Sequence, residues 1–87
     1  MYNLDRFPPC QSSNCFNPEC CPGGHKFKWP ELVGKNGEMA KMTIERENQN
    51  VTGIIMPIGS GKINFCCNRV YIYIDSNHNV VNVPILG

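Results

Sequence analysis

Cysteine is the side chain that offers the most chemistry in this sequence, which contains six cysteines among 87 residues. An even number at this density favours disulfide bonds and an oxidising compartment. Four of the cysteines and one histidine lie close enough in the sequence to suggest a zinc site: Cys10, Cys15, Cys20, Cys21 and His25. They lack the Cys-x-x-Cys pair typical of zinc-binding sequences, so we expect disulfides and neither a metal nor a cofactor.

Residues 59–62 read Gly-Ser-Gly-Lys and look like part of a phosphate-binding loop. The full pattern needs an earlier glycine, where Met56 stands, and a serine or threonine after the lysine, where Ile63 stands. We therefore favour a loop that does not bind nucleotides. The sequence also offers no plausible Ser-His-Asp set and no obvious carboxylate pair, and a chain this short has little room for a deep cleft. We expect that the protein is not an enzyme.

The segment 56–69 separates two apolar runs rich in β-branched residues, which predicts a loop held between two strands. Tight hairpins use only two to five loop residues, and longer loops commonly carry function. Two adjacent cysteines, Cys66 and Cys67, and then Arg69 stand at its far end and could attach it to the rest of the protein. We predict that this loop is the functional part of the chain.

A helix is predicted from about Gly37 to Asn48, because Asn36 is a good N-cap and an acidic residue, Glu38, follows in the first turn. Ala40 and Ile44 lie one turn apart and form its expected buried stripe. Met39 and Met42 should flank that stripe, and the exposed side should carry Lys41, Glu45, Arg46 and Glu47.

Three strands are predicted, at 51–56, 70–75 and 80–83, with a polar turn at 76–79. The second strand alternates aliphatic side chains with Tyr71 and Tyr73, so the tyrosines should share the outer face of the sheet. Trp29 is expected to anchor the core, as a lone tryptophan in a small domain usually does.

Composition limits the kind of partner and the location. The net charge is +1 with both signs mixed, which disfavours nucleic acid, and no apolar run approaches the roughly 20 residues of a membrane span. The first residues show no signal-peptide pattern. If disulfides form, we expect a secreted or vacuolar protein, although synthesis in the cytoplasm stays open. Asn50-Val51-Thr52 would be a glycosylation sequon in a secreted chain.

A series of short motifs follows in a familiar order: Trp29-Pro-Glu-Leu-Val-Gly-Lys, Ala40-Lys41, Ile44-Glu45-Arg46, Asn50-Val51, Pro57-x-Gly59-Ser60, Asn68-Arg69-Val70 and Val83-Pro84-x-x-Gly87. Together they resemble the potato inhibitor I family of serine protease inhibitors, which includes eglin c and barley chymotrypsin inhibitor 2. The cysteine before Asn68 and the Cys-Pro-Gly upstream of Trp29 are most similar to the cucurbit members, which carry one disulfide. The resemblance covers residues 29–87, and residues 1–28 would form an irregular cysteine-rich N-terminal arm.

The resemblance implies an α/β (α+β) fold, with one helix on a small mixed sheet and an extended reactive-site loop between two parallel strands. It also implies that residues 58–66 enter the active site of a trypsin/chymotrypsin- or subtilisin-type serine protease as a substrate would. A loop already fixed in the bound conformation loses little entropy on binding, and ends that stay in place after cleavage favour religation. We expect a monomer with a role in plant defence and the wound response.

Compared with the family, the loop is one residue shorter between Gly59-Ser60 and Asn68-Arg69. Counting back from Asn68-Arg69 places the reactive bond at Ile63-Asn64, and counting forward from Gly59-Ser60 places it at Asn64-Phe65. Lys62 is a further candidate for the specificity residue, directed at trypsin. The expected contact loop is Gly59, Ser60, Gly61, Lys62, Ile63, Asn64 and Phe65.

Support for the loop is expected from Arg69, Cys66, Cys67 and Gly87. Arg69 matches the first of two arginines that brace the loop in the family, and Tyr71 replaces the second. By the resemblance, Cys67 bridges to Cys21 or alternatively to Cys20. Adjacent residues of a strand point to opposite faces, so the Cys66 side chain should point away from that of Cys67. We therefore expect Cys66 to form a second bridge to the arm. The alternative function is an inhibitor-like binding or structural module that no longer inhibits, with an arm that forms disulfides.

Overall fold

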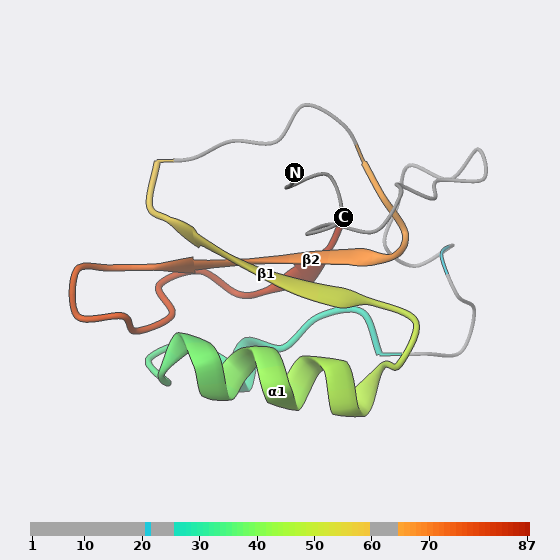
Figure 1. Ribbon diagram of the computed structural model, residues 1–87, viewed down its shortest axis with the longest axis horizontal. Coiled ribbons are helices and arrows are strands. Elements are labelled where there is room, and N and C mark those ends of the chain that lie inside the picture. The colour runs from blue at the N-terminus through green and yellow to red at the C-terminus, as the bar shows by residue number, and fades with distance from the viewer. Residues whose placement is uncertain (1–20, 22–25, 60–64) are drawn as a thin grey trace, which may run out of the picture.

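The computed structural model describes Cys21 and residues 26–59 and 65–87, and it orders them as one helix against a small sheet. The elements are η2 (Pro30–Leu32), α1 (Gly37–Glu47), β1 (Thr52–Pro57), β2 (Arg69–Ile74) and β3 (Ile85–Leu86). The central strand, β2, runs parallel to β1 and antiparallel to β3. α1 covers one face of this mixed sheet (Figure 1). The predicted α+β fold class is confirmed. Of the predicted arm 1–28, Cys21 and residues 26–28 are described, whereas Cys10, Cys15, Cys20 and His25 lie outside the described residues.

The start of α1 is capped as the sequence predicts. The Asn36 side-chain oxygen accepts hydrogen bonds from the backbone N–H groups of Glu38 (2.9 Å) and Met39 (3.2 Å). These are two of the N–H groups that a helix start leaves without an intrahelical partner. At the first helical residue, Gly37, an added Cβ would lie 2.8 Å from Cγ2 of Ile74, so the absence of a side chain lets the helix approach the sheet.

The end of α1 is defined by Asn48, which is only 1% exposed. Its backbone N–H donates to the Ile44 carbonyl (2.9 Å), and its side-chain amide donates to the Lys26 carbonyl (3.0 Å). Its side-chain oxygen accepts from the Asn50 N–H (3.0 Å), which turns the chain towards β1. The helix therefore ends at Glu47, one residue before the predicted end.

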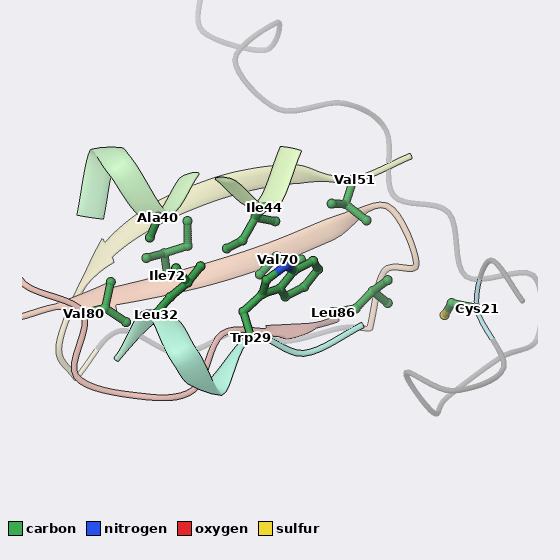
Figure 2. Packing of buried hydrophobic residues seen from close by; sticks show 10 residues of the cluster. All are labelled: Cys21, Trp29, Leu32, Ala40, Ile44, Val51, Val70, Ile72, Val80 and Leu86. Atoms are coloured by element: carbon green, nitrogen blue, oxygen red, sulfur yellow. The ribbon is translucent and has the colours of Figure 1, made fainter. Parts of the chain in front are cut away.

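The core lies between α1 and the sheet. Ala40 and Ile44 from α1 and Val70 and Ile72 from β2 are completely buried, and Figure 2 shows them among the packed residues of the core. Trp29 is 0% exposed, which confirms it as a core anchor. Burial of a large aromatic side chain contributes much of the hydrophobic stabilisation available to a domain of this size.

The charged face of α1 differs from the prediction at two positions. Lys41 and Glu45 form an ion pair that is partly buried rather than fully exposed. The Lys41 ammonium donates to the Gly53 carbonyl (3.0 Å), and the Glu45 carboxylate accepts from the Gly53 N–H (2.8 Å). These side chains satisfy backbone groups on the outer side of β1, with which β2 is the only strand to pair among the described residues. The exposed side chains of α1 are Glu38, Met39, Met42, Arg46 and Glu47.

The two parallel strands lie within one residue of their predicted positions. β1 and β2 pair from Thr52 opposite Arg69 to Pro57 opposite Ile74. The alternation predicted for β2 is also confirmed, because its buried aliphatic residues pack in the core while Tyr71 is only half-buried on the other face. Within the described residues, no helix has the length and apolar character needed to cross a lipid bilayer.

The predicted third strand at 80–83 is wrong, since the strand that pairs with β2 is β3, further along the chain. Val80 makes only an isolated bridge to β2. Its N–H donates to the Lys35 carbonyl (2.8 Å), whereas the N–H of Val81 donates to the Tyr73 carbonyl (2.9 Å). The run 80–83 therefore contributes a single bridge to β2 and not the successive pairs of a ladder.

Candidate functional site

The loop predicted to carry function leaves and rejoins the sheet on the side opposite α1. In Figure 1 the yellow segment after β1 and the orange segment before β2 both rise from that face. The Ile58 N–H donates to the Ile74 carbonyl (3.2 Å), which continues the parallel pairing one residue past β1. The Ile58 side chain is 58% exposed. Gly59 then has a φ of +95°, a conformation that favours glycine even though the space around it is open.

The second end of the loop is attached through side chains and backbone together. Phe65 is half-buried and packs against the core, and Cys66 is only 1% exposed. The Cys66 N–H donates to the Gly87 carbonyl (3.1 Å). Two residues later, the Asn68 carbonyl accepts from the Thr52 N–H (3.0 Å), so the chain is already aligned with β1 before β2 begins.

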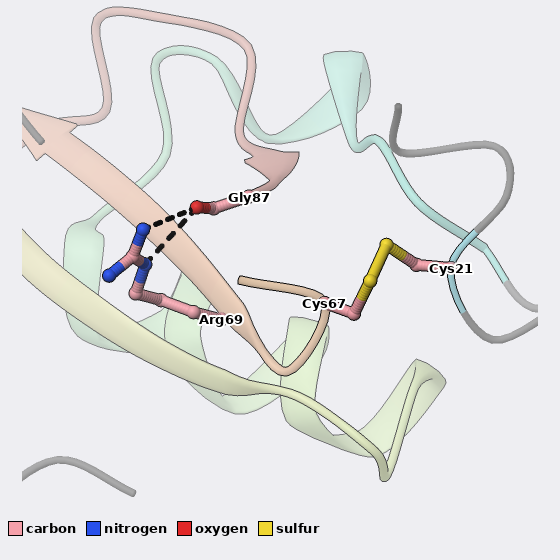
Figure 3. Close-up of a disulfide and its surroundings, with 4 residues drawn as sticks. All are labelled: Cys21, Cys67, Arg69 and Gly87. Carbon is pink, nitrogen blue, oxygen red and sulfur yellow. Dashed lines mark hydrogen bonds between the residues drawn. A yellow bond between two sulfur atoms is a disulfide. The ribbon is translucent and has the colours of Figure 1, made fainter. Parts of the chain in front are cut away.

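The Gly87 carbonyl accepts hydrogen bonds from both Cys66 and Arg69 at this end of the loop. Its carbonyl oxygen accepts hydrogen bonds from Nε (3.2 Å) and Nη2 (2.6 Å) of Arg69, as Figure 3 shows. Its N–H donates to the Arg69 carbonyl (2.7 Å). Hydrogen bonds from a charged guanidinium are stronger than those between neutral groups. The structure thus brings together Arg69, Gly87 and Cys66, three of the residues predicted to support the loop.

A disulfide joins the N-terminal arm to the residue next to Cys66. Cys21 and Cys67 are bonded with their Cα atoms 5.3 Å apart and 46 positions apart in the sequence (Figure 3). Of the two expected partners, Cys21 rather than Cys20 is therefore the one that pairs with Cys67. Closing a loop of this length stabilises the fold by about 4 kcal/mol in the chain-entropy model. Cys66 is also disulfide-bonded.

The outer face of β2 carries an arrangement that the sequence reasoning missed. The guanidinium carbon of Arg69 lies 4.6 Å from the centre of the Tyr71 ring. The ring of Tyr73 follows at 6.0 Å from that of Tyr71, with an interplanar angle of 63°. The alternation of β2 placed these three residues on one face, but it did not reveal that they would contact one another.

A cluster of charged side chains connects the end of the N-terminal arm to the domain. The Lys26 ammonium is paired with Glu31 and with Glu47 (3.0 Å), and the Glu47 carboxylate also accepts from the indole N–H of Trp29 (2.9 Å). Hydrogen bonds from Lys26 lower the pKa of both Glu31 and Glu47, and the bond to Glu31 raises the pKa of Lys26. No sequence pattern predicted this cluster, because its members belong to different elements.

The structure describes the two ends of the predicted contact loop. Gly59 and Phe65 bound the contact loop in the structure, while Ser60, Gly61, Lys62, Ile63 and Asn64 lie outside the described residues. In the part of the chain that is described, no three His, Cys, Asp or Glu side chains come together as metal ligands. The arrangement can present a short backbone segment to a partner while its two ends stay attached to the sheet.

Several known proteins are similar to this chain in sequence and in structure. A model of the potato inhibitor I family matches residues 22–87. A flax (Linum usitatissimum) "Proteinase inhibitor" is 48% identical over 65 residues, covering 74% of this chain and 91% of the relative. A "Trypsin/subtilisin inhibitor" from Amaranthus caudatus is 48% identical over 65 residues, covering 74% and 91%. The crystal structure of bitter gourd trypsin inhibitor superposes with a TM-score of 0.71 and 41% identity, covering 72% of this chain and 94% of that one.

Proposed function

Because this chain belongs to the potato inhibitor I family, we propose that it inhibits serine proteases by presenting residues 58–66 to the protease active site as a substrate would. The chain is a protease inhibitor and not an enzyme, in keeping with its family and its relatives.

The observation that carries the proposal is the attachment of both ends of the loop. The first end is paired to β2 through Ile58. The second is held by the Cys66–Gly87 hydrogen bond, the Cys21–Cys67 disulfide and the Arg69–Gly87 hydrogen bonds. Attached ends lower the ordering cost of binding, and they also keep the two new termini close together after cleavage. Religation can then compete with release, which is what distinguishes an inhibitor from a substrate.

For the reactive bond we propose Ile63-Asn64, with Gly59–Phe65 as the contact loop. One side chain of such a loop enters the primary specificity pocket and decides the target. Ile63 is β-branched and therefore suits an apolar pocket with a wide entrance. Lys62 and Asn64 remain the alternative specificity residues. The proposed targets are proteases of the trypsin/chymotrypsin or subtilisin type, supported by relatives named as trypsin and trypsin/subtilisin inhibitors.

The test is a titration of the purified, oxidised protein against trypsin, chymotrypsin, elastase and subtilisin. We expect tight inhibition of at least one protease and slow formation of a single nick, which mass spectrometry should place between Ile63 and Asn64. A nick at another bond would move the assignment to Lys62 or Asn64. Absence of inhibition, together with covalent dimers on a non-reducing gel, would favour the non-inhibitory structural module.

A pair of substitutions tests the specificity residue directly. Ile63→Lys should strengthen inhibition of trypsin by about a hundredfold or more, because a lysine would then enter the charged primary pocket. Lys62→Ala is the matched control and should change trypsin inhibition by less than about threefold, since a neighbouring residue does not enter that pocket. If Lys62→Ala abolished trypsin inhibition instead, Lys62 would be the specificity residue.

We also propose a secreted or vacuolar location and a monomeric state. The Cys21–Cys67 disulfide supports the location, because such bonds persist in oxidising compartments. Rapid alkylation of native extracts before reduction would test it, and free thiols at Cys21 and Cys67 would contradict it. Sedimentation of the oxidised protein at several concentrations would test the monomer.

A further inference from the structure

On the outer face of β2, the Arg69 side chain contacts two different groups, the Gly87 carbonyl and the Tyr71 ring. Arg69 donates two N–H groups to the Gly87 carbonyl, at 3.2 and 2.6 Å, from the edge of its guanidinium plane. At the same time its guanidinium carbon lies 4.6 Å from the centre of the Tyr71 ring. A guanidinium can do both, because it donates hydrogen bonds in its plane and stacks through its face.

The two contacts restrict different motions of the same side chain. The hydrogen bonds fix the direction in which the N–H groups point, but a long arginine side chain can still rotate about its terminal bonds. A ring against the guanidinium restricts that rotation and excludes water from one side of it. The Tyr73 ring, edge-on to Tyr71 at 6.0 Å, in turn limits the movement of the Tyr71 ring.

We propose that Tyr71 is a positioning residue of the inhibitory loop, and that it acts by holding the Arg69 guanidinium in the orientation that bonds Gly87. Gly87 also accepts the Cys66 N–H, so this orientation bears directly on the second end of the loop. Tyr71 stands where the family resemblance expects a second arginine. The inference rests on the proposed function. In it, the aromatic side chain of Tyr71 takes over the supporting role of the absent second arginine.

Two substitutions separate the ring of Tyr71 from its hydroxyl. Tyr71→Leu removes the ring and should weaken inhibition of the protease that the wild type inhibits most tightly by about fivefold, with a similar rise in the nicking rate. Tyr71→Phe retains the ring, and it should recover most of the inhibition that Tyr71→Leu loses. A loss in Tyr71→Phe as large as that in Tyr71→Leu would overturn the inference, because the hydroxyl would then be the active group.

A structural readout separates positioning from a general loss of stability. In NMR spectra the Nε proton of Arg69 should show an upfield ring-current shift in the wild type and in Tyr71→Phe, and this shift should disappear in Tyr71→Leu. Val80→Ala is the matched control, since it removes buried atoms from the opposite face of the sheet. It should lower the thermal unfolding midpoint without changing the Arg69 shift or the nicking rate. Equal nicking in Val80→Ala and Tyr71→Leu at equal stability would reject a positioning role.

The two proposals fail in distinguishable ways. If the wild type inhibits a protease but Tyr71→Leu does so equally well, the role of Tyr71 is rejected and the proposed function stands. If the wild type inhibits none of the proteases, the proposed function fails. Backbone relaxation of residues 65–69 then tests Tyr71 by itself, and unchanged order in Tyr71→Leu would reject its role.

Discussion

The carbonyl oxygen of Gly87 accepts hydrogen bonds from the Cys66 N–H and from two N–H groups of Arg69. A residue without a side chain therefore connects the last described strand to the second end of the loop. The buried Cys66 N–H would be left without this acceptor if Gly87 were absent, and an unsatisfied buried donor costs more than an average hydrogen bond contributes.

Deletion of Gly87 should lower the free energy of unfolding by about 3 kcal/mol, because two backbone hydrogen bonds and two charge-assisted hydrogen bonds are lost. It should also raise the rate at which a target protease nicks the loop by about tenfold. Urea unfolding and timed mass spectrometry measure the two effects. Val83→Ala, which shortens an exposed side chain a few residues earlier, is the control and should change neither value. A deletion variant with wild-type nicking would show that the Gly87 carbonyl does not support the loop.

Among the elements, α1 is the one whose start is decided most locally. Asn36 bonds two N–H groups within the next three residues, and no contact from a distant segment is needed to explain that geometry. The cap stabilises the helix, and the helix buries Ala40 and Ile44 against β2. The loop leaves from the other face of the sheet, so the cap contributes to stability rather than to recognition (Figure 1).

Asn36→Ala should therefore lower the free energy of unfolding by about 1 kcal/mol and leave the inhibition constant unchanged within about twofold. Asn36→Asp should retain most of the stability, because a carboxylate caps a helix start equally well. Lys35→Ala provides the neighbouring control. A weakened inhibition constant in Asn36→Ala would mean that the cap influences the loop through the sheet.

At the scale of the whole molecule, the cluster of Lys26, Glu31 and Glu47 joins the segment after the disulfide to α1 and to Trp29. Hydrogen bonding to Lys26 lowers the pKa of the two carboxyls in the folded protein. Their contribution to stability is thus complete above the unfolded pKa of about 4.3 and is lost as the pH falls through the lower folded pKa. The raised pKa of Lys26 has the opposite sign, so its contribution is lost only at strongly alkaline pH.

The wild type should accordingly gain more stability between pH 3 and pH 6 than Lys26→Met, in which both carboxyls lose the hydrogen bond from the Lys26 ammonium. All three side chains are substantially exposed, so the difference should be modest and should shrink in 1 M salt. Urea unfolding across that pH range measures it, with Lys35→Met as the control for removing a surface charge. Parallel pH profiles for the wild type and Lys26→Met would contradict a role for the cluster in folding.

Local sequence patterns were sufficient to predict the helix, both long strands and the family. A cap, a buried stripe and a period-two alternation each depend on residues a few positions apart, so they predicted α1, β1 and β2 to within one residue. The motifs also led to Arg69 and to the pairing of Cys21 with Cys67, which the structure contains. The reactive bond at Ile63-Asn64 remains a prediction.

Tertiary structure alone decided which groups meet across the chain. An apolar run at 80–83 has the composition of a strand, yet it forms only an isolated bridge with β2, and β3 is the strand that pairs with β2. Lys41 and Glu45 turn from the expected exposed face to the backbone of Gly53, because an edge strand leaves its outer N–H and C=O groups available. The contact of Tyr71 with Arg69 likewise depends on where β2 places both side chains in space. A sequence pattern states which side of an element is buried, but the partner on that side is chosen by packing between segments far apart in the chain.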